Sequence, residues 1–341
     1  MLDHIIRQDL ESILKQLGKD GFRSNGIVIT GGAGFLGSWL CDVLVSLQAA
    51  VTCIDDFSTG LRENVEHLLD ASKFRLLDLD VTHSNLEDDR HHLILHLASR
   101  ASPEEYQQHP IETLAANSQG TKNMLELARK CDAAFVYASS SEVYGDAEII
   151  PTPESYWGNV NPVGPRSCYD EGKRFGEALC MAYHRAYGVD VRIVRIFNSY
   201  GPRLRSDGFY GRALSRFIDQ ALSDRDVTVH GTGDQTRSFC YVTDTVTAIL
   251  LAATRSEMEG QVVNVGNPNE VSILELAEKV KAITGTSSKV AFHPRPTDDP
   301  QRRCPDISKA KELLRWSPIV TLEEGLRKTV DWFMQYRQRI I

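Results

Sequence analysis

Tyr169 is followed four residues later by Lys173, and a glycine-rich turn at residues 31–37 lies far upstream of the pair. On a helix, this spacing puts both side chains on one face. The lysine ammonium would then stabilise the phenolate and lower the pKa of the tyrosine. Such a tyrosine can take the proton from a carbinol while hydride passes to a nicotinamide. The spacing alone is common on helices, but together with the glycine turn it indicates nicotinamide-dependent redox chemistry.

The turn reads Gly31-Gly-Ala-Gly34-Phe-Leu-Gly37, directly after a short apolar run and at the start of a helical pattern. Glycine is needed where the backbone turns tightly, approaches a pyrophosphate and lets a helix pack on a strand. The N-terminus of the helix offers N–H groups to phosphate. We therefore expect a dinucleotide site here, the alternative being a glycine turn without a ligand.

Two acidic residues, Asp55 and Asp56, stand at the end of the second apolar run. An acidic side chain at this place accepts hydrogen bonds from the adenosine ribose and repels a 2′-phosphate. The predicted cofactor is therefore NAD rather than NADP.

Short apolar runs alternate with helical patterns along the first two thirds of the chain, which predicts βαβ units and a parallel sheet. The expected strands are residues 26–30, 50–54, 74–77, 92–97, 134–138, 189–196 and 262–265. The clearest helical patterns are residues 38–47, 111–130 and 169–187. The expected fold class is α/β, with a doubly wound parallel (Rossmann) sheet and a smaller α/β C-terminal lobe that binds the substrate.

The expected organisation has three parts. Residues 1–24 form a peripheral N-terminal helical extension. Residues 25–197 and about 237–265 form the NAD-binding domain. Residues 198–236 and 266–341 form a smaller C-terminal lobe, with two helical patterns at 272–284 and 308–315 separated by a proline-rich stretch.

The composition is that of an ordinary globular protein, with 42% hydrophobic and 25% charged residues. The formal net charge of −8 argues against a nucleic-acid partner, and no apolar run approaches the length of a membrane span. The seven cysteines are odd in number and include no Cys-x-x-Cys pair, which favours reduced thiols in the cytoplasm. His92 and His96 lie in a strand pattern, where residues four apart are about 13 Å apart, so no metal site is expected.

Longer stretches, from residue 26 to about residue 332, resemble the extended short-chain dehydrogenase/reductase family. The glycine turn and the Tyr-Lys pair are shared by the whole superfamily. Three stretches narrow the resemblance to the UDP-glucuronic acid decarboxylase (UDP-xylose synthase) branch: Ser141-Glu-Val-Tyr-Gly-Asp146, Tyr156-Trp-Gly158 and Asp298-Asp-Pro-Gln-Arg-Arg303.

The resemblance implies a set of ligand contacts. Beside Gly31, Gly34 and Gly37, the cofactor contacts would be Phe35, Leu36, Asp55, Asp56, Phe57, Ser58, Thr59, Gly60, Asp80, Val81, Leu97, Ser99, Tyr169 and Lys173. The UDP-sugar contacts would be Asn198, Arg212, Gln235 and Arg237. Arginine suits a diphosphate because its planar fork donates two parallel bonds, although both arginines are also compatible with solvated surface charges.

The resemblance also implies a redox-neutral conversion of UDP-glucuronic acid to UDP-xylose. The C4 hydroxyl would be oxidised with Tyr169 as base, Lys173 lowering its pKa and Ser140 bonding the same oxygen. The resulting 4-keto acid would lose CO₂ through an enolate, C5 would be protonated, and C4 would be reduced again by the retained NADH.

Glu142 and Arg303 match the family pattern for the middle step. Arg303 would stabilise the enolate or deliver the C5 proton, and Glu142 would orient the sugar or a water. In the structural alternatives, Glu142 caps the loop after the fifth strand and Arg303 pairs with Asp298 or Asp299.

The run Ser140-Ser141-Glu142 separates this chain from its neighbours in the family. The 4,6-dehydratases carry Thr-Asp-Glu there, and Ser141 cannot protonate a leaving hydroxyl as their aspartate does. The 4-epimerases usually lack the glutamate. Two alternatives stay open. The first is another enzyme of the same fold, either a UDP-glucuronate 4-epimerase or a decarboxylase that releases the UDP-4-keto-pentose. The second is an inactive binding or scaffold protein, and the intact Tyr169 and Lys173 argue against it.

Two positions depart from the family pattern. Arg100 stands where proline is usual, and Ala115 stands where lysine is common. We hypothesise that Arg100 replaces the lost lysine as partner of the substrate carboxylate; otherwise the sugar preference itself has changed. By resemblance, residues 111–130 and 169–187 would also pair with a second copy in a four-helix bundle, giving a homodimer; the alternative is that the N-terminal extension covers the same apolar surface.

Overall fold

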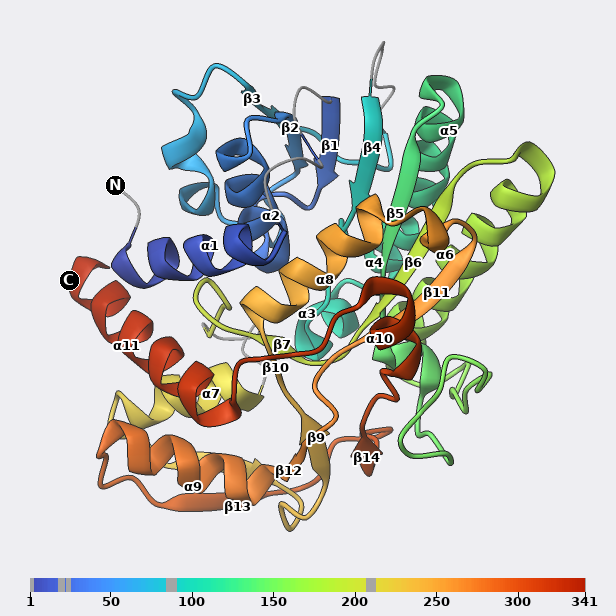
Figure 1. Cartoon of the computed structure of the whole chain (residues 1–341). Helices are drawn as coiled ribbons and strands as arrows, with labels where there is room; N and C mark the ends of the chain where they lie inside the picture. The colour runs from blue at the N-terminus through green and yellow to red at the C-terminus, as the bar shows by residue number, and fades with distance from the viewer. Residues whose placement is uncertain (1–2, 18–21, 23–25, 84–90, 207–212, 341) are drawn as a thin grey trace.

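The computed structural model describes residues 3–17, 22, 26–83, 91–206 and 213–340. At its centre lies a seven-stranded parallel sheet in the order β11-β6-β5-β4-β1-β2-β3 (Figure 1). The strands are β1 Gly26–Thr30, β2 Ala50–Asp55, β3 Phe74–Asp78, β4 His91–His96, β5 Ala134–Ser140, β6 Val191–Ile196 and β11 Gln261–Val265. The predicted Rossmann class and its seven strands are confirmed.

The chain reverses direction across the sheet between β3 and β4, because β1 pairs with both β2 and β4. In parallel sheets, such a switch point opens a crevice outside the carboxyl ends of the strands. Thr30 at the end of β1 lies beside Ile54 of β2 and His96 of β4. The loops that follow these three strands therefore meet at one edge of the sheet.

Helices cover both faces of the sheet, as the alternating strand residues require. Ile27 and Ile29 of β1 belong to the cluster that includes α1, α2 and α8, whereas Val28 belongs to the cluster with α5 and α6. The helices of this part of the chain are α1 His4–Leu17, α2 Phe35–Ser46, α3 Pro103–Gln108, α4 Pro110–Ala115, α5 Thr121–Cys131, α6 Ser167–Tyr187 and α8 Val242–Thr254.

The helix expected over residues 111–130 is interrupted by one π-helical segment, Ala116–Gly120. Its buried Asn117 donates from Nδ2 to the Thr113 carbonyl and to Ser99 Oγ, at 2.9 and 3.0 Å. A π segment widens the turn, and such segments often lie at functional sites. Here it brings a buried amide to the loop that follows β4.

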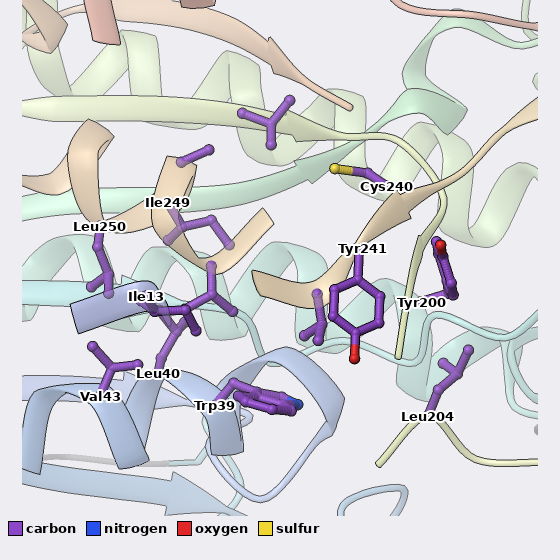
Figure 2. Close-up of a cluster of buried hydrophobic side chains, with 14 of the residues drawn as sticks. Ile13, Trp39, Leu40, Val43, Tyr200, Leu204, Cys240, Tyr241, Ile249 and Leu250 are labelled. Atoms are coloured by element: carbon purple, nitrogen blue, oxygen red, sulfur yellow. The ribbon is translucent and has the colours of Figure 1, made fainter. Parts of the chain in front are cut away.

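The N-terminal helix is not peripheral, contrary to the sequence-based expectation. Ile13 of α1 is fully buried in the cluster with Leu40 of α2 and Ile249 of α8 (Figure 2). The buried Asp9 accepts hydrogen bonds from Tyr241 Oη at 2.6 Å and Lys328 Nζ at 2.9 Å. These bonds tie α1 to the C-terminal part of the chain.

The remaining elements surround the carboxyl edge of the sheet. The helices are α7 Ala213–Ala221, α9 Ile273–Thr284, α10 Ser308–Leu314 and α11 Leu322–Ile340. The strands are β7 Ser199–Tyr200, β8 Val227–His230, β9 Thr236–Ser238, β10 Cys240–Tyr241, β12 Glu270–Ser272, β13 Val290–His293 and β14 Arg302–Arg303. The predicted helices over 272–284 and 308–315 are present, but α11 was not anticipated.

All seven cysteines fall in the described residues and carry free thiols. In the same part of the chain, we find no helix with the length and apolar character needed to span a bilayer.

Candidate active site

A cavity of about 900 Å³ lies along the carboxyl edge of the sheet, between the sheet and the C-terminal elements. Its lining includes most of the site residues that were predicted from the sequence, and they come from distant parts of the chain. Those that line it are Gly31, Gly34, Phe35, Leu36, Gly37, Asp55, Asp56, Ser58, Thr59, Asp80, Val81, Leu97, Ser99, Arg100, Ser140, Ser141, Glu142, Tyr169, Lys173, Asn198, Gln235, Arg237 and Arg303. Phe57 and Gly60 do not line it, and Arg212 lies outside the described residues.

The glycine turn has the geometry of a dinucleotide cradle. Gly31 has a φ of +66°, and a Cβ there would lie 2.9 Å from the Ala98 nitrogen. A Cβ on Gly37 would collide with the carbonyl oxygen of Gly31. Gly34 precedes α2 in an extended conformation, and no side chain caps that helix. The free N–H groups at its N-terminus therefore face the cavity, which fits a pyrophosphate.

The two acidic residues after β2 have different surroundings. The carboxylate of Asp55 is buried and accepts hydrogen bonds from the backbone N–H groups of Ala33 and Phe57, at 2.8 and 2.9 Å. Burial raises its pKa to about 6. A Cβ on Gly60 would lie 2.5 Å from the same carboxylate. Asp56 is exposed at the cavity, so it is the acidic residue that can reach a ribose.

Tyr169 and Lys173 lie one turn apart on α6 and both line the cavity, as does Ser140 at the end of β5. Lys173 Nζ donates to the Ala138 carbonyl at 2.8 Å and lies 5.8 Å from the centre of the Tyr169 ring. Burial lowers the pKa of Lys173 to about 7. The hydrogen bond to Ala138 therefore holds the Lys173 ammonium against β5, close to the ring of Tyr169.

Glu142 is held by two arginines. Arg303 donates to both of its carboxylate oxygens, one bond measuring 2.8 Å, and Arg166 donates to Oε2. Arg303 therefore does not pair with Asp298 or Asp299. The cap of the short turn after β5 is the Ser140 hydroxyl, which accepts from the Glu142 N–H at 3.3 Å, so the alternative role for Glu142 is wrong.

The two arginines overcome the burial of Glu142 and lower the pKa of its carboxyl to about 2. Asp170, whose Oδ2 lies 3.8 Å from Arg166 Nε, shows the opposite shift. Burial and the neighbouring Glu142 raise the pKa of Asp170 to about 8. At neutral pH, Glu142 is an anion and most Asp170 side chains carry a proton.

Three of the residues expected to hold the nucleotide sugar, Asn198, Gln235 and Arg237, line the same cavity. Arg237 is buried, and its Nη2 donates to Asp299 Oδ1 at 2.8 Å. Asn198 donates to the Ser238 carbonyl at 3.1 Å, and Gln235 donates to the His230 carbonyl at 2.8 Å. Arg237 is therefore not a solvated surface charge.

Arg100 and Ala115, the two departures from the family pattern, both line the cavity. Arg100 forms an ion pair with Glu105 of α3, whose side chain is 4% exposed. The guanidinium is thus already oriented by a buried acid.

The cavity residues that were missed from the sequence include Arg166 and Tyr106. Arg166 had a local signal, because it lies three residues before Tyr169 at the start of the same helix. Tyr106 on α3 had none, since it reaches the site only through the packing of α3 on α6.

We find no group of three or more potential metal ligands in the described part of the chain. His96 instead lies fully inside the protein at the end of β4, with Nδ1 2.7 Å from Thr30 Oγ1 and Nε2 3.1 Å from Thr121 Oγ1. Burial lowers its pKa to about 3, so it is neutral at physiological pH.

The geometry agrees with comparisons to known proteins. A profile described as the NAD dependent epimerase/dehydratase family matches residues 27–266, which is more than half of the chain. The chain belongs to this family. The resemblance to extended short-chain dehydrogenases/reductases and the prediction of NAD as cofactor are thereby confirmed.

Within this family, similar proteins indicate which branch the chain most resembles. The chain is 50% identical over 308 residues to UDP-glucuronic acid decarboxylase 1 of Xenopus tropicalis, covering 90% of this chain and 72% of that protein. It is 49% identical over 316 residues to UDP-glucuronic acid decarboxylase 1 of Arabidopsis thaliana, covering 92% and 70%. Among solved structures, UDP-glucuronic acid 4-epimerase from Bacillus cereus in complex with UDP-glucuronic acid and NAD gives a TM-score of 0.82 at 30% identity, covering 91% and 99%.

Proposed function

We propose that this enzyme decarboxylates UDP-glucuronic acid to UDP-xylose with no net change in the redox state of NAD. The observation that carries the proposal is the 50% identity to named decarboxylases over nine tenths of the chain, against 30% for the UDP-glucuronic acid 4-epimerase. The ion-paired Glu142 and Arg303, in the same cavity as Tyr169 and Lys173, support it.

Tyr169 acts as the base that takes the proton from the C4 hydroxyl. The Lys173 ammonium favours the phenolate electrostatically, and Ser140 donates a hydrogen bond to the same substrate oxygen. A bound NAD would supply the acceptor for the C4 hydride, and the resulting NADH would supply the donor for the later reduction of C4. Because Lys173 has a pKa of about 7, its proton can leave and return near neutral pH.

The middle step breaks the C5–C6 bond of the 4-keto acid. The electron pair of that bond moves toward the C4 oxygen as an enolate, CO₂ leaves, and C5 then takes a proton that originates from solvent. Glu142 is an anion with a pKa of about 2, so it does not supply that proton. We assign to Glu142 the orientation of Arg303 and Arg166, and to Arg303 the stabilisation of the enolate charge.

For the cofactor, we propose that the turn glycines and the start of α2 bind the pyrophosphate. Asp56 binds the adenosine ribose, and Asp80 with Val81 lies at the adenine. The buried bonds of Asp55 give it a different role, which is to hold the turn at Ala33 in place. Gly60 is needed here because a side chain at this position would collide with the Asp55 carboxylate.

For the nucleotide sugar, we propose contacts from Asn198, Gln235 and Arg237, and from Arg212, which lies outside the described residues. Arg100 is proposed as a partner of the substrate carboxylate. Substituting Arg100→Ala should raise KM for UDP-glucuronic acid far more than KM for NAD, and an unchanged KM for the sugar would contradict this role.

We further propose a homodimer formed by α4, α5 and α6. Ile111 on α4 and Phe175 on α6 are 72% and 50% exposed, which favours burial against a second copy. Sedimentation velocity would test this assembly. The seven free thiols support a reducing, cytoplasmic location, and we retain the division into an N-terminal helix, a cofactor domain and a sugar-binding lobe.

The experiment that tests the function is proton NMR of UDP-glucuronic acid incubated with the enzyme and catalytic NAD. The anomeric signal of UDP-xylose, without accumulation of NADH, is expected. A UDP-4-keto-pentose with stoichiometric NADH would mean that the final reduction is missing. UDP-galacturonic acid would identify an epimerase and contradict the proposal.

A further inference from the structure

Arg216 on α7 has a guanidinium for which the described residues offer no bonded acceptor. The residue lines the cavity, and its sequence neighbours Ser215 and Phe217 are buried. Its Nε is shielded from solvent and finds no hydrogen-bond partner in the described part of the chain. The centre of the Phe217 ring lies 5.9 Å from Cζ, a weak contact that leaves the charge uncompensated. Because a buried cation without an anion is unfavourable, a ligand in the cavity would explain it.

The other arginines that line the cavity all donate to a carboxylate or to a main-chain carbonyl of the protein. They are Arg100, Arg166, Arg205, Arg237 and Arg303. Burial lowers the pKa of Arg216, and Glu104 on α3 opposes that shift, yet the described residues show no ion pair between the two. Arg216 is therefore the exception among the cavity arginines that the structure describes.

Arg216 lies close to residues that we assign to the nucleotide sugar. Burial lowers the pKa of His230 at the end of β8, and the charge of Arg216 adds to that shift, so the two side chains are within electrostatic reach. The His230 carbonyl accepts the hydrogen bond of Gln235, and the charge of Arg237 is already met by Asp299. Arg216 thus supplies the uncompensated positive charge among the described residues of this part of the cavity.

We propose that the Arg216 guanidinium binds the diphosphate of the nucleotide sugar. This inference rests on the proposed function and adds a binding residue for its substrate. The pyrophosphate of NAD is assigned to the glycine turn and the start of α2, and the sugar carboxylate to Arg100. The diphosphate is the anion that remains for Arg216. A guanidinium suits it, since its planar fork donates two parallel bonds to phosphate and keeps its charge at every physiological pH.

The test uses ligands that carry the candidate anions in different combinations. UDP has the diphosphate alone, UDP-glucuronic acid adds the carboxylate, and NAD has its own pyrophosphate. Dissociation constants are measured by calorimetry in a Tyr169→Phe background that blocks turnover, with NAD present for the two uridine ligands. Arg216→Gln should weaken UDP and UDP-glucuronic acid by the same factor, about tenfold, and change NAD by less than about twofold.

Each other outcome assigns Arg216 differently. A loss for UDP-glucuronic acid but not for UDP would place the sugar carboxylate at Arg216, and a loss for NAD would place the cofactor there. Either result, or no effect on any ligand, would overturn the inference. Arg225→Gln is the matched control, because Arg225 follows α7, has a 60% exposed side chain paired with Asp219, and does not line the cavity. All three dissociation constants should then stay within about twofold.

Melting temperatures separate a ligand contact from a structural role. Without ligand, the Arg216→Gln protein should melt at or above the temperature of its parent, because an unbonded buried charge has been removed. Saturating UDP should then raise the melting temperature less than it does in the parent. An unliganded variant that melts well below the parent would show that the arginine stabilises the fold itself, which contradicts the inference.

The outcomes for the function and for Arg216 are separable. If the wild-type enzyme makes UDP-xylose but its affinity for UDP does not depend on Arg216, the inference alone fails. If no UDP-xylose forms while UDP binding still depends on Arg216, the proposed reaction fails and the diphosphate contact stands.

Discussion

The two ends of the cavity are built in different ways. The cofactor end is made mostly of backbone: a glycine turn, an uncapped helix start, and the buried Asp55 whose two carboxylate oxygens bond to main-chain N–H groups. The sugar end is made of charged side chains from distant segments, with Glu142, Arg166 and Arg303 joined across more than 160 positions of sequence. The open groups at the cofactor end are backbone N–H groups of the uncapped α2, whereas the sugar end contains the Tyr106 hydroxyl, for which the described residues offer no hydrogen-bond partner.

This difference has a physical reason. The pyrophosphate and ribose of a dinucleotide are the same in every reaction, so a rigid backbone cradle serves them well. The sugar end must bind an anion and then stabilise a change in its charge. Ion pairs and a free hydrogen-bond donor, held by separate elements, provide that capacity.

The largest predicted effect comes where the two ends meet. Tyr169→Phe should lower kcat by about a thousandfold or more, because it removes the proposed base for the C4 proton. The affinity for NAD should stay close to that of the wild type. Product formation by NMR and NAD binding by fluorescence measure the two effects. Tyr187→Phe on the same helix should leave both unchanged, and a Tyr169→Phe enzyme with more than a tenth of wild-type kcat would rule out this role.

Gly37→Ala should damage the cofactor end alone. The new Cβ would collide with the Gly31 carbonyl, a backbone atom that cannot rotate away, so we expect a loss of about 3 kcal/mol or more in stability or NAD binding. Thermal denaturation with and without NAD would measure it. Gly285→Ala is the control, since a Cβ there meets no atom within 4 Å and only the positive φ of 67° is strained. A Gly37→Ala protein as stable as the control would refute the packing argument.

Arg303→Gln should damage the sugar end alone. Removing this guanidinium should lower kcat about a hundredfold, because the enolate loses its charge partner, while NAD still binds. Arg302→Gln is the matched control, because Arg302 is 52% exposed and pairs with Glu270 on the surface. Its activity should stay within about twofold of the wild type. Equal losses in the two variants would contradict the assignment.

The smallest predicted effect is a pH dependence at Asp170. The folded protein holds a proton on Asp170 up to about pH 8, whereas the unfolded chain releases it near the ordinary value of 3.8. The contribution of Asp170 to stability therefore falls as pH rises from about 4 to about 8.

Asp170→Asn removes that dependence. Relative to the wild type, the variant should gain about 1 kcal/mol or more between pH 5 and pH 8.5, measured from melting temperatures. Asp55 and Asp244 titrate in the same direction but are present in both proteins and cancel. A difference between the two proteins that does not change with pH would show that Asp170 is ionised in the folded state.

The contrast between the two ends of the cavity also explains which features could be predicted from the sequence. The strands, the glycine turn and the Tyr169–Lys173 pair are local patterns, so they could be located from spacing alone. Glu142 and Arg303 were each identified through family resemblance, but their ion pair was not predicted, because it depends on β14 pairing with β9, a contact that no local pattern encodes. Tyr106 was missed for the same reason.

Two helices illustrate the other limit. The N-terminal helix was predicted but placed at the periphery, because its partners α2 and α8 come from distant parts of the chain. The C-terminal helix α11 was not recognised, although Leu326, Val330 and Phe333 pack into the main core. Amphipathic patterns indicate a helix but not the surface that receives it.

The most direct test of the account is the reaction of UDP-glucuronic acid in D₂O, with catalytic NAD and the product examined by NMR. The account predicts UDP-xylose that carries one deuterium at C5, from protonation of the enolate by solvent, and none at C4, where the original hydrogen is returned. Deuterium at C4, or a product that keeps its carboxylate, would contradict the proposed decarboxylation and its retained cofactor.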